Sequence, residues 1–327
     1  MPKQPSPKQP STESPEDILV GGQAVIEGVM MRTPRATAVA VRRMDGSMEV
    51  TGKPVKRLSD FWKPLSWPVV RGFAVLLQSL VLGMRALNFS INAAMKDEEA
   101  AQAARKPGRA AKAGSTYPIA LSMAAAIAVA VLLFILLPLW ITTLLKGPIP
   151  AIHNWLVFNL VDGLIRVVIF LGYIVLVSML KDIRRVFEYH GAEHKVVYTW
   201  EAGEELTVGN ARGKSTLHPR CGTSFLMFVM VTSILVFSLF KFDAFWAIFL
   251  SRLVLVPLVS GLSYELIRLS APRSGKGFFR LIVLPGLGLQ RITTKEPSDD
   301  QLEVAIRSLK EALELDGIQS RGAQTAA

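Results

Sequence analysis

Residues 119–145 read IALSMAAAIAVAVLLFILLPLWITTLL, which is 27 consecutive positions without a charged side chain. At about 1.5 Å per residue, a helix of this length exceeds the roughly 30 Å hydrocarbon core of a bilayer. A helix buried in a soluble protein would carry its apolar residues at periodic positions instead. The stretch therefore predicts an all-α integral membrane protein.

Four segments are long and apolar enough to be expected as transmembrane helices, namely 118–145, 153–180, 223–241 and 244–268. Residues 67–94 are also apolar, but polar side chains recur there about every seven residues, and basic segments flank both ends. This pattern favours an interfacial or re-entrant helix. Since the expected inner segments are rich in Lys and Arg, we predict a multi-pass cell-membrane protein with both termini in the cytoplasm.

The segments outside the membrane have distinct compositions. Asp45 and Gly46 separate two short apolar runs, which predicts a β-hairpin. The start of the chain is rich in Pro, Ser, Lys and Gln, which is typical of disorder. The expected division is a disordered tail (1–17), a small cytoplasmic β unit (18–64), the interfacial or re-entrant helix (65–95), a basic linker (96–116), transmembrane helices one and two (117–180), a cytoplasmic metal-site loop with a hairpin (181–222), helices three and four (223–268), and a cytoplasmic C-terminal segment (269–327).

A soluble amphipathic helix is expected within that last segment, over residues 299–315. Ser298 and Gln301 have the spacing of a capping box, which marks a helix N-terminus. The helix should dock on the protein's own cytoplasmic unit through one apolar stripe: Leu302, Ile306, Leu309 and Leu313.

The net charge of +11 could indicate a nucleic-acid partner or a membrane surface. Lys and Arg cluster beside the apolar runs, where they can meet anionic lipid headgroups. No nucleic-acid-reading motif is present, so the expected partner is the lipid bilayer, and the sequence points to no protein partner. The single cysteine, Cys221, excludes an intrachain disulfide.

The second expected span carries Asp162 and Arg166, four positions apart on one helical face. This spacing favours an ion pair. Charges at membrane depth face protein or water, so the pair either holds helices together or lies on a polar path through the bundle.

Three of the four histidines, His190, His194 and His218, lie within 29 residues, and Cys221 follows three positions later. On a helix, His190 and His194 would point the same way, as two imidazole ligands of Zn²⁺ do. Glu193 completes the H-x-x-E-H pattern of inverted zinc peptidases, in which the acid activates a metal-bound water. Gly191 weakens a helix at this point, so the geometry depends on the rest of the fold.

His218 and Cys221 offer two further ligands at the entrance to the third expected span. A helix N-terminus lowers the pKa of a thiol and favours the thiolate that binds metals. Four protein ligands would make a closed, structural site, whereas three would leave a position for water. Imidazole and thiolate ligands predict a transition metal, most simply zinc. The alternative is that these polar residues only hold the segment 196–217 together.

Two acidic residues compete for a place among the ligands. Glu265, at the cytoplasmic end of the fourth expected span, could supply the downstream carboxylate that inverted zinc peptidases use, or it could pair with Arg268. Glu27 lies in a glycine-rich apolar segment and is a weaker candidate.

Four motifs together resemble the signatures of the YqhQ-like bacterial membrane proteins, over about residues 18–315. They are GGQAVIEGVMMR (21–32), YHGAEHK (189–195), HPRCGT (218–223) and LQRITTKEP (289–297). The family is described as predicted metal-dependent enzymes. The resemblance therefore implies a bacterial inner-membrane protein with a metal site, and it implies no substrate.

These observations leave three hypotheses for the function. The first is a metal-dependent hydrolase at the membrane surface, with Glu193 as general base and a peptide, a lipid or a nucleotide-linked group as substrate. The second is a scaffold or binding protein with a structural metal site. The third, which has the least support, is a transporter with Asp162 and Arg166 on its path.

Overall fold

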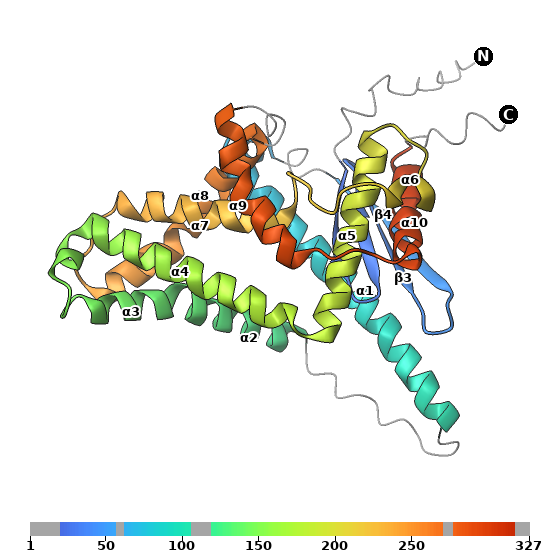
Figure 1. Ribbon diagram of the computed structural model, residues 1–327, viewed down its shortest axis with the longest axis horizontal. Helices are drawn as coiled ribbons and strands as arrows, with labels where there is room; N and C mark the ends of the chain where they lie inside the picture. Colours follow the sequence, from blue (N-terminus) through green and yellow to red (C-terminus); the bar gives the residue numbers. More distant parts are fainter. Residues whose placement is uncertain (1–19, 57–61, 106–118, 271–276, 318–327) are drawn as a thin grey trace, which may run out of the picture.

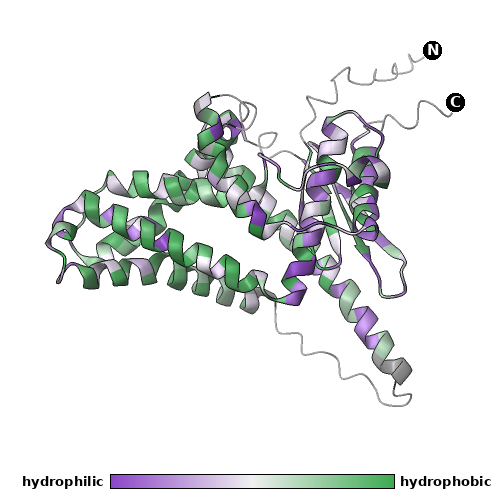
Figure 2. Ribbon diagram, in the orientation of Figure 1, coloured by the Kyte–Doolittle hydropathy of each residue, from purple (hydrophilic) through white to green (hydrophobic). Residues whose placement is uncertain are grey.

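The computed structural model describes residues 20–56, 62–105, 119–270 and 277–317. It consists of a bundle of apolar helices with a sheet and more polar helices at one end (Figure 1). Hydropathy follows this division, since the bundle is largely hydrophobic and hydrophilic residues concentrate in the unit at the other end (Figure 2). The expected disordered tail, 1–17, lies outside the described residues.

The β unit is an antiparallel meander of four strands in the order β1-β2-β3-β4. The turn between β3 and β4 contains Gly46 with φ of +85°, a conformation that glycine adopts without strain. This confirms the hairpin expected at Asp45 and Gly46. The strands are β1 (Gly21–Val25), β2 (Gly28–Arg32), β3 (Ala36–Arg42) and β4 (Met48–Pro54).

Helices cover both faces of the sheet. Strand residues alternate between the faces, as a period of two requires. Met30 and Val39 lie in one apolar cluster with Leu82 and Ala86 of α1 (Val70–Arg105). The opposite face packs against α5 (Lys181–Glu201) and α10 (Asp299–Asp316). The sheet is therefore the middle layer between α1 and the α5–α10 pair.

Helix α10 confirms the expected C-terminal helix. Ser298 and Gln301 form the reciprocal capping box, and Gly317 ends the helix in the left-handed conformation. Ser308 also bonds the sheet directly, because its Oγ lies 3.1 Å from the carbonyl oxygen of Ala38. The apolar stripe is buried against the protein's own sheet and α5, as the sequence predicts: Leu302, Ile306, Leu309 and Leu313.

The bundle differs from the expected set of spans. Within the described residues, four helices are long and apolar enough to cross a membrane: Val70–Ala101 of α1, Ala124–Leu145, Trp155–Ser178 and Phe245–Ser270. The number of candidate spans agrees with the prediction. The helices differ, because α1 is among the four and the expected third span is not. The expected span 223–241 is the helix α7 (Gly222–Ser238), which has only 17 residues.

The other bundle helices are α2 (Ile119–Val131), which continues through a π-helical segment (Leu132–Leu136) into α3 (Leu137–Leu145), then α4 (Trp155–Ser178), α8 (Phe245–Ser270) and α9 (Gly277–Thr293).

Helix α4 shows how the bundle meets the bilayer. Leu160, Leu164 and Val168 recur at helical spacing and leave 59%, 61% and 62% of their surface exposed. An apolar stripe of this kind is expected to face lipid, because hydrocarbon tails solvate it without cost.

Helix α1 is a single unbroken helix of 36 residues. Its first turns pack along α8, and the part from Leu82 onward covers the sheet, where Asp97 pairs with Arg43 at 2.7 Å. The interfacial or re-entrant placement of 67–94 stays a prediction. The expected basic linker 96–116 is wrong over its first part, because residues 96–105 continue α1, and residues 106–118 lie outside the description.

Two further expectations need correction. The segment 181–222 is not a loop with a hairpin, because it contains α5 and the short helix α6 (Val208–Arg212). The segment after residue 268 contains a second helix, α9, which packs against α7. The sequence prediction missed α9 because Pro285, Gly286 and Gly288 interrupt its apolar pattern.

Candidate metal centre

Helix α5 presents His190 and His194 on the same side, with ring centroids 4.5 Å apart. Gly191 lies next to them, and a Cβ at this position would stand 2.0 Å from the carbonyl oxygen of Lys295. The glycine that weakens an isolated helix is therefore needed for tertiary contact. It lets the connection between α9 and α10 run against α5 at backbone distance.

That connection fixes the orientation of the first histidine. The backbone N–H of Lys295 donates to the carbonyl oxygen of Phe187 over 2.9 Å. The carbonyl oxygen of Thr293 lies 2.8 Å from Nδ1 of His190. A carbonyl oxygen only accepts, so Nδ1 carries the proton and the lone pair remains on Nε2.

His194 is held in the same way from the other side. Its Nδ1 lies 2.5 Å from the carbonyl oxygen of Thr216, which again assigns the lone pair to Nε2. This Nε2 is buried and makes no hydrogen bond within the described structure. A buried nitrogen lone pair without a partner is costly, and a bound metal would satisfy it.

Cys221 completes a group of three. It is the N-cap of α7, and its Sγ accepts from the backbone N–H of Thr223 over 3.3 Å. Nε2 of His190 lies 3.1 Å from this sulfur. One ligand atom each from His190, His194 and Cys221 lies within 4.8 Å of the other two. We call these three residues the ligand cluster.

The spacing of the ligand cluster fits a metal after a small contraction. Tetrahedral zinc holds nitrogen and sulfur ligands about 3.3–3.8 Å from one another, given its usual bond lengths. The side chains would need to close by roughly 1 Å. Both imidazoles already have carbonyl partners on Nδ1, which is the usual support of a metal-binding histidine. The residues present therefore fit a transition metal.

His218 lies beside the ligand cluster without belonging to it. Its ring centroid is 5.7 Å from that of His194. Its Nε2 lies 3.3 Å from the Glu201 carboxylate, and its Nδ1 accepts from the backbone N–H of Arg220 over 3.3 Å. Both ring nitrogens of His218 therefore contact groups other than His190 and Cys221.

The two competing carboxylates lie elsewhere. Glu265 pairs with Arg71 of α1 at 2.5 Å, rather than with Arg268, which lies three positions later in α8. Glu27 forms an ion pair with Arg185 and accepts from the hydroxyl of Tyr189 over 3.3 Å. Glu265 thus joins α8 to α1, and Glu27 joins the β1–β2 turn to α5. Both carboxylates hold elements of the fold together.

Glu193 is the carboxylate that does lie at the cluster. Its Oε2 stands 3.4 Å from Nε2 of His194, and only 6% of the residue is exposed. Strand β1 covers it closely, since a Cβ on Gly22 would stand 2.7 Å from Cγ of Glu193. Burial raises the pKa of Glu193, although the neighbouring His190 and His218 oppose the shift. Burial likewise lowers the pKa of His194, which favours the neutral imidazole that binds metals.

A glutamine that sequence reasoning did not single out supports the loop that carries Cys221. Gln290 of α9 is fully buried, accepts from the backbone N–H of His218 over 2.7 Å and donates to its carbonyl oxygen over 2.8 Å. It also donates to Oγ of Ser224 over 2.7 Å. The motif 289–297 contains Gln290, but only the fold shows that it clamps this loop.

Comparisons with known proteins agree on one family. A family model described as "Protein of unknown function (DUF1385)" matches residues 67–315. The chain is 34% identical over 305 residues to "Uncharacterized protein YqhQ" of Bacillus subtilis (strain 168), which covers 92% of this chain and 94% of that protein. No solved structure matches.

Proposed function

We propose that this chain, which belongs to the DUF1385 family, is a membrane-embedded, metal-dependent hydrolase whose site faces the cytoplasm at the membrane surface. One observation carries the proposal. Three convergent ligand atoms of His190, His194 and Cys221 lie beside the buried carboxylate of Glu193.

Zinc is the metal that best suits two imidazoles and a thiolate, and in a three-ligand site it acts as a Lewis acid that activates water. The protein residues have separate parts in this chemistry. Thr293 and Thr216 hold the two histidines in the ligand tautomer through their carbonyl oxygens. Glu193 would take a proton from the attacking water and return it to the leaving group.

The raised pKa of Glu193 suits that role, because a carboxyl group whose pKa is moved toward neutrality both accepts and donates protons. The contacts of His218 support a three-ligand site. With Nε2 at Glu201 and Nδ1 at Arg220, His218 leaves the fourth position to water or substrate.

A second candidate is a closed structural site in a scaffold protein, and the burial of the cluster favours it. His194 is 1% exposed and Cys221 is 7% exposed, so the ligands are well shielded from solvent. His218 would be the fourth ligand if its ring turned from Glu201 toward His194. Such a site would hold α5 against α7 and would catalyse no reaction.

The substitution Glu193→Gln separates the two candidates. Under the hydrolase proposal the zinc content is unchanged, while kcat falls by about 10²–10⁴-fold because the general base is lost. The probes are p-nitrophenyl acetate, bis-p-nitrophenyl phosphate and a fluorogenic peptide library, with purified full-length protein and zinc measured by mass spectrometry. Glu205→Gln, at an exposed position after α5, is the matched control and should change neither quantity.

The hydrolase proposal fails if wild-type protein with zinc turns over none of these probes, or if Glu193→Gln is as active as wild type. Equal zinc in both proteins with no turnover would support the scaffold. Loss of zinc in Glu193→Gln would instead make Glu193 a ligand.

The cytoplasmic orientation of the site has its own test. The sheet, α5 and α10 lie at one end of the bundle, and the α3–α4 and α7–α8 connections lie at the other (Figure 1). A cysteine placed at Ala244 should react with a membrane-impermeant maleimide in intact cells, whereas one at Lys310 should react only after lysis. The reverse pattern would place the ligand cluster outside. A third cysteine at Arg105 should react like the one at Lys310, because Asp97 of the same helix pairs with Arg43 of the β unit.

A further inference from the structure

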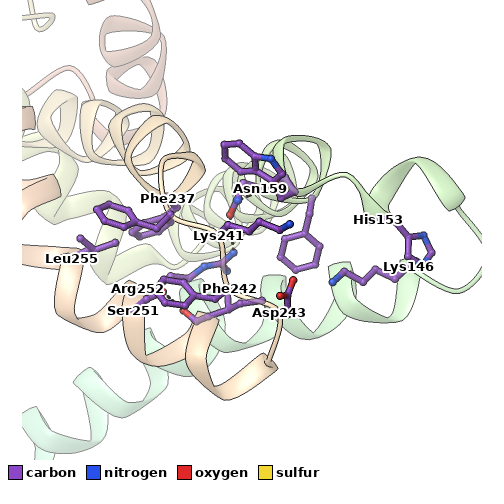
Figure 3. Close-up of a pocket in the computed structure, with 14 residues that line it drawn as sticks. Lys146, His153, Asn159, Phe237, Lys241, Phe242, Asp243, Ser251, Arg252 and Leu255 are labelled. Carbon is purple, nitrogen blue, oxygen red and sulfur yellow. Dashed lines mark hydrogen bonds between the residues drawn. The ribbon is translucent and has the colours of Figure 1, made fainter.

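A second site lies at the end of the bundle opposite the sheet. A cavity of about 50 Å³ opens between the α3–α4 and α7–α8 connections, far from the ligand cluster (Figure 3). Its lining comes from α4, α7, α8 and the two connections, and it mixes aromatic rings with charged groups. The polar and charged lining residues are Lys146, His153, Asn159, Lys241, Asp243, Ser251 and Arg252.

Buried charges under the cavity do not balance. Asp162 of α4 pairs with Arg166 at 2.6 Å, which confirms the ion pair predicted from their spacing. It also pairs with Arg252 of α8 at 2.7 Å. All three side chains are nearly inaccessible to solvent, with residue exposures of 1%, 5% and 1%. Two guanidinium groups therefore share one carboxylate at membrane depth, where an unpaired charge is expensive.

The hydrogen-bonding of the two arginines is also incomplete. Nε of Arg166 and Nε of Arg252 are buried and have no hydrogen-bond partner in the described structure. The ring of Phe237 lies 5.2 and 5.5 Å from the two guanidinium carbons, which offsets part of the excess charge by cation–π attraction. A neutral ring cannot supply the missing acceptor. Arg252 is also one of the residues that line the cavity.

More positive charge stands at the mouth of the cavity. Lys146 lies with its Nζ 4.5 Å from the ring centroid of Phe158, and Lys241 enters from the α7–α8 connection. Among the described residues, neither lysine makes an ion pair within 4.0 Å. Asp243 is the one acidic group among the described lining residues, and Figure 3 shows Lys146 and Asp243 pointing toward the same space. The lining thus carries three cations against one anion.

We propose that this cavity is a binding site for a small oxyanion, carboxylate or phosphate, held by Arg252, Lys241 and Lys146. The guanidinium group forms paired hydrogen bonds with such groups, and the low dielectric around Arg252 strengthens them. The size agrees. A buried water needs roughly 10–15 Å³, so this cavity takes a few waters or one small polyatomic anion. The same oxyanion could arrive as a free solute or as the phosphate of a lipid headgroup.

The test uses full-length protein in dodecyl maltoside and ³²P-labelled inorganic phosphate in equilibrium dialysis at constant ionic strength, with acetate as competitor. Wild-type protein should bind phosphate saturably. The double substitution Lys146→Gln with Lys241→Gln should weaken binding at least tenfold, because it removes two of the three cations. The matched control, Lys181→Gln with Lys310→Gln, makes the same charge change at exposed positions remote from the cavity and should bind like wild type.

Arg252→Gln tests the buried partner. It leaves Asp162 balanced by Arg166 alone, so the protein should fold and lose binding. If Arg252→Gln does not fold, the lysine variants still decide the question.

A second experiment, on bound lipid, identifies the source of the oxyanion. Phosphatidylglycerol retained by wild type in native mass spectrometry, and lost in the Lys146/Lys241 variant, would identify a headgroup as the ligand. Saturable phosphate binding would identify a free solute. The proposal is overturned if wild type binds neither phosphate, acetate nor phosphatidylglycerol, or if the lysine variant binds them as well as its control.

Discussion

His194→Ala is expected to strip the purified protein of metal, from about one zinc per chain to almost none. Changing a group that merely supports a ligand typically costs 10–100-fold in metal affinity, and loss of the ligand itself should cost more. His194 is the most buried ligand, and its Nε2 makes no hydrogen bond within the described structure. Zinc per chain, measured by inductively coupled plasma mass spectrometry after gel filtration in detergent, gives the answer.

Alanine variants of the two other histidines provide a control and a count of the ligands. His153 lies at the far end of the bundle with Nδ1 3.0 Å from the carbonyl oxygen of Pro150, so His153→Ala is the control and should keep its zinc. His218→Ala should keep it as well if three residues form the site, and should lose it if four do. Full zinc occupancy in His194→Ala would contradict a metal site in this cluster.

Gly191→Ala is expected to destabilise the protein by about 3 kcal/mol and to lower its zinc content. The new methyl group would meet the backbone oxygen of Lys295 at 2.0 Å, and backbone cannot turn aside as a long side chain can. Relief of the clash would move the α9–α10 connection off α5. The carbonyl oxygen of Thr293 would then leave Nδ1 of His190. Chemical denaturation in detergent, followed by intrinsic fluorescence, measures the loss.

Gly209→Ala is the matched control, because nothing lies within 4 Å of a Cβ at that position in α6. Alanine has the higher helix propensity, by up to about 1 kcal/mol, so this variant should be unchanged or slightly more stable. If Gly191→Ala were as stable as Gly209→Ala, the close packing of the connection on α5 would be refuted.

The sequence by itself determined the features that depend on local pattern. The uncharged run 119–145 has no stable place outside a bilayer, the Asp45-Gly46 turn requires φ above zero, and the capping box and stripe of α10 follow helical periodicity. The spacing of His190 and His194 also predicted that both rings would share one side of a helix, and α5 shows this arrangement. These features could be predicted because each depends on residues within a few turns of one another.

Only the tertiary structure decided which groups meet. The carbonyl oxygens of Thr216 and Thr293 carry no side-chain signal, because every residue has one, yet they set the tautomers of both histidines. The partner of Glu265 is Arg71, 194 positions away, and Arg252 joins Asp162 from another helix. Gly191 is unfavourable by helix propensity, but the fold requires it because Lys295 passes so close. Contacts between distant segments depend on how the whole chain packs, and no local pattern encodes that packing.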